Sequence, residues 1–309
     1  MSNLIFIGLS THMRPKMLEE TLKSLGKLLI PDEAELMLLV TDNDGNESAR
    51  KVFEKYAPSI PFTSYYLCNL HVGTVHQRNL IISEALKKNA THVAMIDDDE
   101  TASPEWMVKM LQIMEKYDAD VVDGAVERIL PSGTPKWMIK GGFYEWHSFK
   151  TGSIRRAASG ANCLYKVRLI KEMGLRFHPA FNLTGGSDTF FFTQSSKGGA
   201  KIVWYDERLV KEYLPKSRVN VRWLRMRSFR RTNSKFLRKR LEMGYFRASL
   251  IYSFNGIFQL FSGALIFILL APFGPIMRVQ GQRVFMKGLG TFNGILGRSY
   301  QEYSDIHGH

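Results

Sequence analysis

The chain has 309 residues, of which 45% are hydrophobic and 23% are charged, so it can bury a full core. Two cysteines exclude a disulfide-stabilised secreted scaffold and fit a reducing compartment, and the eight histidines show no H-x-x-x-H spacing. The net charge of +13 is uneven, because residues 211–250 carry thirteen Lys and Arg against two Glu. This segment is therefore expected to have an anionic partner.

The first part of the chain alternates between short apolar runs and helical patterns. Strands are predicted at 4–9, 35–41, 62–68 and 92–97, and helices at about 15–25, 48–56, 74–88 and 103–117. Such alternation predicts a mainly parallel sheet that is covered by helices on both faces, with ligands at the carboxyl ends of the strands. The first run lacks the basic residues and cleavage site of a signal peptide, so we expect it to be a strand.

The middle of the chain has shorter and more mixed segments. We expect residues 121–127, 161–165 and 201–205 to complete the sheet, partly with antiparallel strands. The Pro- and Gly-rich stretch between the first two is expected to shape the far wall of a pocket.

Four consecutive acids follow the apolar run 92–96: Asp97, Asp98, Asp99 and Glu100. Adjacent carboxylates repel one another, and a divalent metal that carries phosphate oxygens is the usual solution to such repulsion. The alternative is an acidic turn before a helix, since the TASP sequence that follows is a typical helix start. Both interpretations remain open from this stretch alone.

A second candidate site is the sequence GGSDT, in which paired glycines precede Asp188 and an apolar run. Glycines allow backbone geometries that are closed to other residues, so Asp188 can be presented to a cavity as a general base. The alternative is a helix N-cap. P-loop and Rossmann fingerprints are missing from the sequence, so any nucleotide would be bound in another way.

The stretch 248–277 contains 30 residues without a charge, which is long enough to span a bilayer. Basic residues on both flanks disfavour a single crossing, so we expect a re-entrant or in-plane hydrophobic hairpin. A buried helix of a soluble core is the alternative. For the basic segment before it, anionic lipid headgroups explain the composition better than nucleic acid, although several of residues 238–240 fit a solvated helix face.

Seven motifs, in this order, resemble the family 2 glycosyltransferases, and most closely the glucosyltransferases of succinoglycan-type exopolysaccharide assembly. They are Thr11 with Arg14-Pro15, Asp42-Asn43, Arg78-Asn79, Asp97 to Glu100 with Trp106, Pro135 to Met138, Gly185 to Thr189, and Pro215 with Arg218, Trp223-Leu224 and Phe229-Arg230. The resemblance covers at least residues 5–230.

This resemblance implies an α/β glycosyltransferase domain of the GT-A fold over residues 1–215 and a basic, hydrophobic, membrane-associating helical region over residues 216–309. It implies inverting transfer of a hexose, with glucose from UDP-glucose as the expected donor, to a lipid-linked saccharide in bacterial surface polysaccharide synthesis. The expected cofactor is Mg²⁺ or Mn²⁺. The expected place is the cytoplasmic face of the membrane, against anionic lipid and without nucleic acid as a partner.

Roles for individual residues also follow from the resemblance. The base that accepts the acceptor's proton is expected to be Asp188, and the metal ligand Asp99. The nucleotide-sugar pocket is expected to be lined by Thr11, Arg14, Asp42, Arg78, Asp97 and Asp98. Contacts to the diphosphate or the acceptor are expected from Lys211, Arg218, Trp223, Arg227 and Arg230.

The sequence departs from the family pattern at two positions. Ser187 stands where relatives usually have Glu, and Lys211 stands where many have a metal-binding His. A protonated lysine cannot bind a metal, but it can contact a diphosphate. Two rival functions remain open: a sugar nucleotidyltransferase, which also uses an acid cluster with metal, and a non-catalytic, membrane-bound sugar-binding or scaffold protein.

Overall fold

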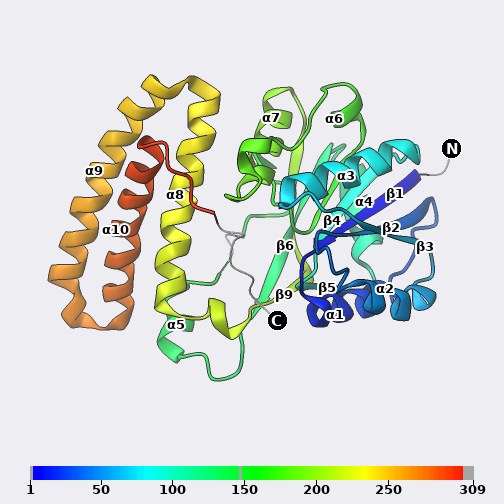
Figure 1. Ribbon diagram of the computed structural model, residues 1–309, viewed down its shortest axis with the longest axis horizontal. Helices are drawn as coiled ribbons and strands as arrows, with labels where there is room; N and C mark the ends of the chain where they lie inside the picture. Colours follow the sequence, from blue (N-terminus) through cyan, green and yellow to red (C-terminus); the bar gives the residue numbers. More distant parts are fainter. Residues whose placement is uncertain (1–2, 146–147, 302–309) are drawn as a thin grey trace.

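The structure is a computed structural model that describes residues 3–145 and 148–301 (Figure 1). Its centre is a mixed sheet in the order β3-β2-β1-β4-β8-β6-β9-β5, with β7 paired to β9. The parallel half consists of β1 (Asn3–Thr11), β2 (Ala34–Asp42), β3 (Thr63–Cys68) and β4 (His92–Asp97). These four strands lie where the alternating sequence pattern predicts them.

The second half of the sheet is partly antiparallel, as expected. It consists of β5 (Glu100–Ala102), β6 (Val121–Ile129), β7 (Ile154–Arg155), β8 (Cys163–Lys166) and β9 (Ile202–Tyr213). Strand β8 is antiparallel to both β4 and β6, whereas β6 and β9 are parallel. Strand β9 is much longer than the predicted segment 201–205, because Leu209 and Val210 are apolar and pair its second half with β5 and β6.

Helices cover both faces of the sheet and bury one hydrophobic cluster on each side. The first face carries α1 (Pro15–Leu25), α2 (Arg50–Tyr56), η1 (Ala57–Ser59) and α4 (Trp106–Lys116). The second face carries α3 (Thr74–Lys87), α6 (Arg168–Lys171), η2 (Pro179–Phe181) and α7 (Ser187–Lys197). The short helix α5 (Lys136–Lys140) packs in a third cluster against the C-terminal helices.

After η3 (Lys216–Arg218), three long helices form a layer beside the sheet (Figure 1). They are α8 (Val221–Met243), α9 (Tyr245–Leu270) and α10 (Pro275–Ile295), and η4 (Ala271–Phe273) joins the last two. Helix α8 lies nearest the sheet, α10 is in the middle and α9 is outermost. The expected hydrophobic hairpin therefore turns at residues 271–274, near Pro272, and residues 248–270 form one uninterrupted helix.

Glycines allow α10 to pack closely on both neighbours. Toward α9, a Cβ on Gly263 would lie 2.3 Å from the Phe285 amide nitrogen, and one on Gly288 would lie 2.9 Å from the Gly256 carbonyl. Toward α8, a Cβ on Gly290 would lie 2.1 Å from the Phe229 carbonyl. Close backbone approach of this kind is typical of helices that associate in an apolar environment.

The outward face of α9 is apolar and uncovered. Residues 245–273 contain a window of mean hydropathy 2.0, of which only 11% is buried, so the interpretation as a buried core helix is wrong. The exposed side chains on α9 include Phe246, Leu250, Phe254, Phe258, Phe261, Leu265 and Ile268. A continuous apolar face of this size marks an interaction surface.

Candidate functional site

The acids that end β4 meet polar residues from the loop after β1, because both parallel strands end at the same edge of the sheet. The Thr11 hydroxyl donates a 2.7 Å hydrogen bond to Asp98. Arg14 forms an ion pair with Asp98 and a 3.2 Å hydrogen bond with Asp99. Three residues predicted for the nucleotide pocket thus lie together with the predicted metal ligand.

The C-terminal part of the chain reaches the same acids through Arg218 at the end of η3. Its Nη1 atom lies 3.2 Å from Asp99 Oδ2 and 3.8 Å from Glu212 Oε1. Glu212 in turn accepts a 2.7 Å hydrogen bond from Arg128 on β6. Neither Arg128 nor Glu212 was expected at the site, since nothing in the sequence indicates that their strands meet here.

The conformation of the acidic turn depends on two polar residues of α1. The buried Thr21 hydroxyl lies 2.7 Å from the Glu100 carbonyl and 3.0 Å from that of Asp98. The Ser24 hydroxyl accepts a hydrogen bond from the Ala102 amide. Sequence reasoning missed both residues, because a Thr or Ser on an otherwise apolar helix face has many ordinary explanations.

Burial and mutual repulsion raise the pKa values of Asp97, Asp98 and Glu100. Burial raises the pKa of Asp98 above its usual range, and Arg14 opposes this shift. The pKa of Glu100 is raised further still, by burial and by repulsion from Asp97. Burial alone would lower the pKa of Arg14, but the surrounding aspartates raise it. In this structure, arginines therefore neutralise the cluster.

Within the part of the chain that the structure describes, no group of three His, Cys, Asp or Glu side chains could hold a metal alone. Both hydrogen bonds of the Asp99 carboxylate go to Oδ2, from Arg14 and Arg218. Its Oδ1 is thus available for one metal bond. One carboxylate with substrate phosphates is an ordinary ligand set for Mg²⁺, so the residues fit a metal that arrives with a diphosphate.

Asp188 lies in the first turn of α7, where it is fixed by backbone donors. Its Oδ2 accepts a 2.8 Å hydrogen bond from the Gly160 amide, and its Oδ1 accepts one of 2.8 Å from the Thr189 amide. Gly186, with φ of 90°, takes the N-cap position that was one interpretation of Asp188. The glycine therefore turns the chain and leaves the carboxylate in the first turn of the helix.

Arg78 binds Ser187, the residue before the expected base, and lies within electrostatic range of Asp97. Its Nη1 donates a 3.0 Å hydrogen bond to the Ser187 hydroxyl, and its guanidinium lies 5.4 Å from the centre of the Phe177 ring. Burial, Asp123, Arg78, Asp188 and Asp97 all act on the pKa of the Cys163 thiol, and the net effect is to raise it well above its usual value. Asp97 and Asp188 therefore both lie within electrostatic range of the Cys163 thiol.

Asp123 on β6 belongs to this region, although sequence reasoning missed it. Its carboxylate accepts a 2.9 Å hydrogen bond from the Ser159 amide, next to the Gly160 amide that holds Asp188. Burial raises the pKa of Asp123 to about 7, and repulsion from Asp188 adds to the shift. Asp123 thus positions the loop that supports the expected base.

Two residues with predicted site roles lie apart from this arrangement. Both oxygens of the fully buried Asp42 are engaged, one by the Asp44 amide and the other by the Ala49 amide and the Tyr66 hydroxyl. The half-exposed Lys211 points toward Glu127, 4.0 Å away, and not toward the acids. Base recognition by Asp42 and phosphate contact by Lys211 remain predictions.

The predicted aromatic and basic residues of α8 face the catalytic half of the molecule. Trp223 stacks on Tyr144 with 6.0 Å between ring centres, and the Arg227 guanidinium lies 4.8 Å from the Trp223 ring centre. Burial lowers the pKa of Arg227 well below its usual value, and Arg128, Arg231 and Arg230 add to this. Trp223 and Arg227 thus approach the site from one helix, and the contact of Arg230 with the diphosphate or the acceptor remains a prediction.

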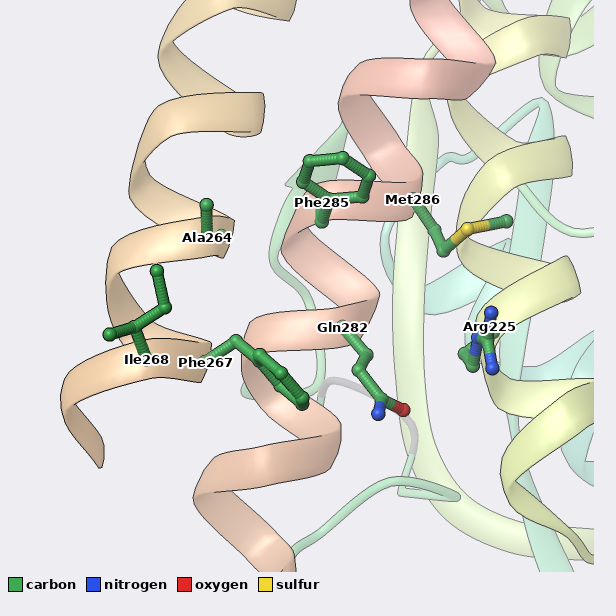
Figure 2. Close-up of a pocket in the computed structure, with 8 residues that line it drawn as sticks. Arg225, Ala264, Phe267, Ile268, Gln282, Phe285 and Met286 are labelled. Atoms are coloured by element: carbon green, nitrogen blue, oxygen red, sulfur yellow. The ribbon is translucent and has the colours of Figure 1, made fainter. Parts of the chain in front are cut away.

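Two cavities flank these residues. One of about 400 Å³ lies beside β6 and α5, with Arg128, Tyr144, Trp204 and Asp206 in its lining. The other, of about 270 Å³, lies among the C-terminal helices and is mostly apolar, with Arg225 and Gln282 as its polar residues (Figure 2). The first has the aromatic and polar lining typical of a saccharide site, and the second suits a hydrocarbon chain.

Solved structures with the same architecture bind nucleotide sugars. The mannosyltransferase PcManGT of Pyrobaculum calidifontis, in complex with GDP-Man and Mn²⁺, superposes with a TM-score of 0.62 at 14% identity, covering 96% of this chain and 88% of its own. TarS of S. aureus (residues 1–349), in complex with UDP-GlcNAc, gives 0.53 at 17% identity, covering 97% and 93%. The fold is therefore that of the GT-A glycosyltransferases, as predicted.

The sequence comparison defines the family. Residues 6–174 match the model of glycosyl transferase family 2. The chain is 32% identical over 226 residues to the succinoglycan biosynthesis protein ExoM of Rhizobium meliloti (strain 1021), covering 73% of this chain and 72% of that protein. The chain belongs to glycosyl transferase family 2 and is a glycosyltransferase, so these two predictions are confirmed.

Asp123 makes stability depend on pH. An unfolded Asp titrates near about 3.9, whereas Asp123 titrates at about 7 in the folded chain, so the unfolded state loses its proton first as pH rises. The free energy of unfolding should fall across this interval. Asp123→Asn keeps the Ser159 hydrogen bond and should raise the free energy of unfolding by on the order of 2 kcal/mol at about pH 8, with no gain near pH 4.

Denaturant titration of both proteins at the two pH values measures this difference. An equal gain at both would show that the shape of the side chain, and not its charge, is responsible. Asp118→Asn, on the exposed turn after α4, is the matched control.

Proposed function

We propose that this glycosyltransferase moves a hexose from a UDP-sugar to a lipid-linked saccharide, with inversion at the anomeric carbon, in the synthesis of a bacterial surface polysaccharide. The observations that support this most directly are a carboxylate, Asp188, that is fixed by two backbone amides, and a nearby cluster of Arg14, Asp97–Asp99 and Arg218. A base and nearby cations suit a single displacement.

The donor would bind where the cluster lies. Thr11, Arg14, Arg78, Asp97 and Asp98 would contact its nucleoside and ribose. The structural neighbours bind UDP, UDP-GlcNAc and GDP-Man, which supports a nucleotide-sugar donor. The relationship to a succinoglycan biosynthesis protein supports exopolysaccharide synthesis and thereby a UDP-linked hexose.

In the reaction, the acceptor hydroxyl oxygen attacks the anomeric carbon while Asp188 takes its proton. The bond between that carbon and the diphosphate oxygen breaks on the opposite face, which inverts the configuration. Arg14 and Arg218 face the acids where negative charge would grow on the departing diphosphate. A bound Mg²⁺ or Mn²⁺, held by Asp99, would supply Lewis-acid neutralisation of the same diphosphate.

The C-terminal helices support an in-plane attachment to the membrane. Because Gly263 packs on Gly281 and Gly256 on Gly288, Arg283 and Lys287 lie level with the middle of α9. If α9 spanned the bilayer, these two charges would lie in the hydrocarbon core, which is expensive. An α9 that lies in the interface leaves them in the polar region and buries only its outward face. Both flanks then stay on the cytoplasmic side.

Asp188→Asn should reduce sugar transfer by roughly a thousand-fold or more, because the reaction loses its proton acceptor. The affinity for UDP should stay within about two-fold, since the cluster at the other end of the site is intact. Transfer is measured with labelled UDP-sugar and a lipid-linked acceptor, and UDP affinity by calorimetry, with exposed Asp118→Asn as the control. Loss of both sugar transfer and UDP binding would contradict a role as base. Release of pyrophosphate would identify a nucleotidyltransferase.

Asp99→Asn should remove the effect of metal on nucleotide binding. Mn²⁺ should tighten UDP binding to the wild-type protein by about ten-fold or more, and the variant should show little of this gain, because an amide is a poorer metal ligand than a carboxylate. Calorimetric titration of UDP with and without Mn²⁺ measures both affinities. Asp32→Asn, on the exposed surface, serves as control. An unchanged Mn²⁺ effect would rule out Asp99 as the ligand.

Membrane binding should depend on the outward face of α9. Phe254→Glu with Phe261→Glu should weaken partitioning to anionic phospholipid vesicles by about a hundred-fold or more, since both exposed rings would leave the interface. Cosedimentation measures the partitioning. Leu70→Glu with Val72→Glu changes two equally exposed apolar residues outside the helical layer and should have no effect. Equal partitioning of the two double variants would refute this attachment.

A further inference from the structure

Four cations line one side of the contact between α8 and α10, and only Arg227 among them has an expected contact to the diphosphate or the acceptor. We call them the cationic row: Arg227 and Arg231 on α8, and Arg283 and Lys287 on α10. Among residues 3–145 and 148–301, no carboxylate forms an ion pair with any member of the row. Four cations held together without a counter-charge indicate a site for an anion.

Packing between the helices holds the row together. The Arg283 Nε donates a 3.4 Å hydrogen bond to the Ser228 hydroxyl of α8, and its guanidinium lies 5.0 Å from the centre of the Phe143 ring. The Lys287 carbonyl accepts a 2.7 Å hydrogen bond from the Thr232 hydroxyl, which places Lys287 beside Arg231. Arg231 is exposed, and the other three members are half-buried.

The members of the row repel one another. Burial lowers the pKa of Arg283 and of Lys287, and the neighbouring Arg231 adds to both shifts. Arg231 also acts on the pKa of Arg227, which burial lowers most. A multivalent anion that touches several members would relieve this repulsion.

The row also has a direction. Arg227 lies near Arg128 and Glu212, which belong to the cluster around Asp99, and Lys287 lies on the middle helix of the membrane-binding layer. Headgroups of a bilayer that meets α9 on its outward face would be separated from the row by α10. A ligand that touches all four members of the row would therefore extend from the helical layer toward the acid cluster.

We propose that the cationic row binds the diphosphate of the lipid-linked acceptor, at a site separate from the donor diphosphate. This rests on the proposed function, which requires such an acceptor. A lipid diphosphate carries at least two negative charges on adjacent phosphates, which matches a row of cations along two helices better than a single phosphate does. The row would hold the lipid end while the saccharide reaches Asp188.

The experiment uses the full chain in detergent, with UDP and Mn²⁺ present to fill the donor site, and a short prenyl diphosphate as the probe. Arg231→Gln with Arg283→Gln should weaken probe binding by about thirty-fold, because two charged contacts are lost. Arg222→Gln with Arg278→Gln removes the same charge from exposed positions on the same two helices and should bind as wild type. Thermal unfolding verifies that both double variants are folded.

Two outcomes would overturn the inference. The first is equal probe affinity in both double variants. The second is a row variant that keeps its affinity for the probe but partitions less to phosphatidylglycerol vesicles that lack the probe, since the cations would then bind ordinary headgroups.

Probe binding does not require turnover. A wild-type protein that binds the probe but transfers no sugar would therefore contradict the proposed function and leave the row supported. In a protein that does transfer, the row variant should raise KM for the acceptor by the same factor.

Discussion

The structure depends on the neutralisation of Asp98 and Asp99 by Arg14 and Arg218. Buried carboxylates are costly unless cations and hydrogen bonds accompany them, so removing one partner leaves an uncompensated charge. The two arginines come from the loop after β1 and from η3, and they lie 85 residues before and 119 residues after Asp99 in the sequence. These ion pairs connect the loop after β1 to the start of the C-terminal helices.

This connection determines where the layer of C-terminal helices lies. Helix α8 begins directly after Arg218 and is held again by the hydrogen bond from Ser234 to the Thr184 carbonyl, 2.9 Å long, beside the glycines before α7. Glycine contacts then place α10 on α8 and α9 on α10. The outward face of α9 is therefore positioned relative to the active site through a series of rigid contacts, which suits an enzyme whose acceptor is attached to a membrane.

Sequence reasoning located most of the fold and the part of the site that consists of motifs. Asp97–Asp99, Arg14 and Arg218 were found because charged residues at strand ends and in family order are informative without knowledge of packing. Thr21, Asp123 and Glu212 were missed because their roles arise only when distant segments meet. The position of the hairpin turn was not predicted for a related reason: an uncharged stretch shows where a helix can be apolar, and the structure shows that α9 ends just before Pro272 and Gly274.

The same physical principle separates the cations that are matched inside the fold from those that are not. Arg218 neutralises buried acids of the catalytic domain, and so does Arg128 through Glu212, so their charges are already matched inside the fold. Arg231, Arg283 and Lys287 have no such partner among the described residues, and their mutual repulsion is a cost to the folded chain unless an anion binds. The retention of such a cost in the helices between the acid cluster and the apolar face of α9 supports the proposed anionic ligand that connects the two.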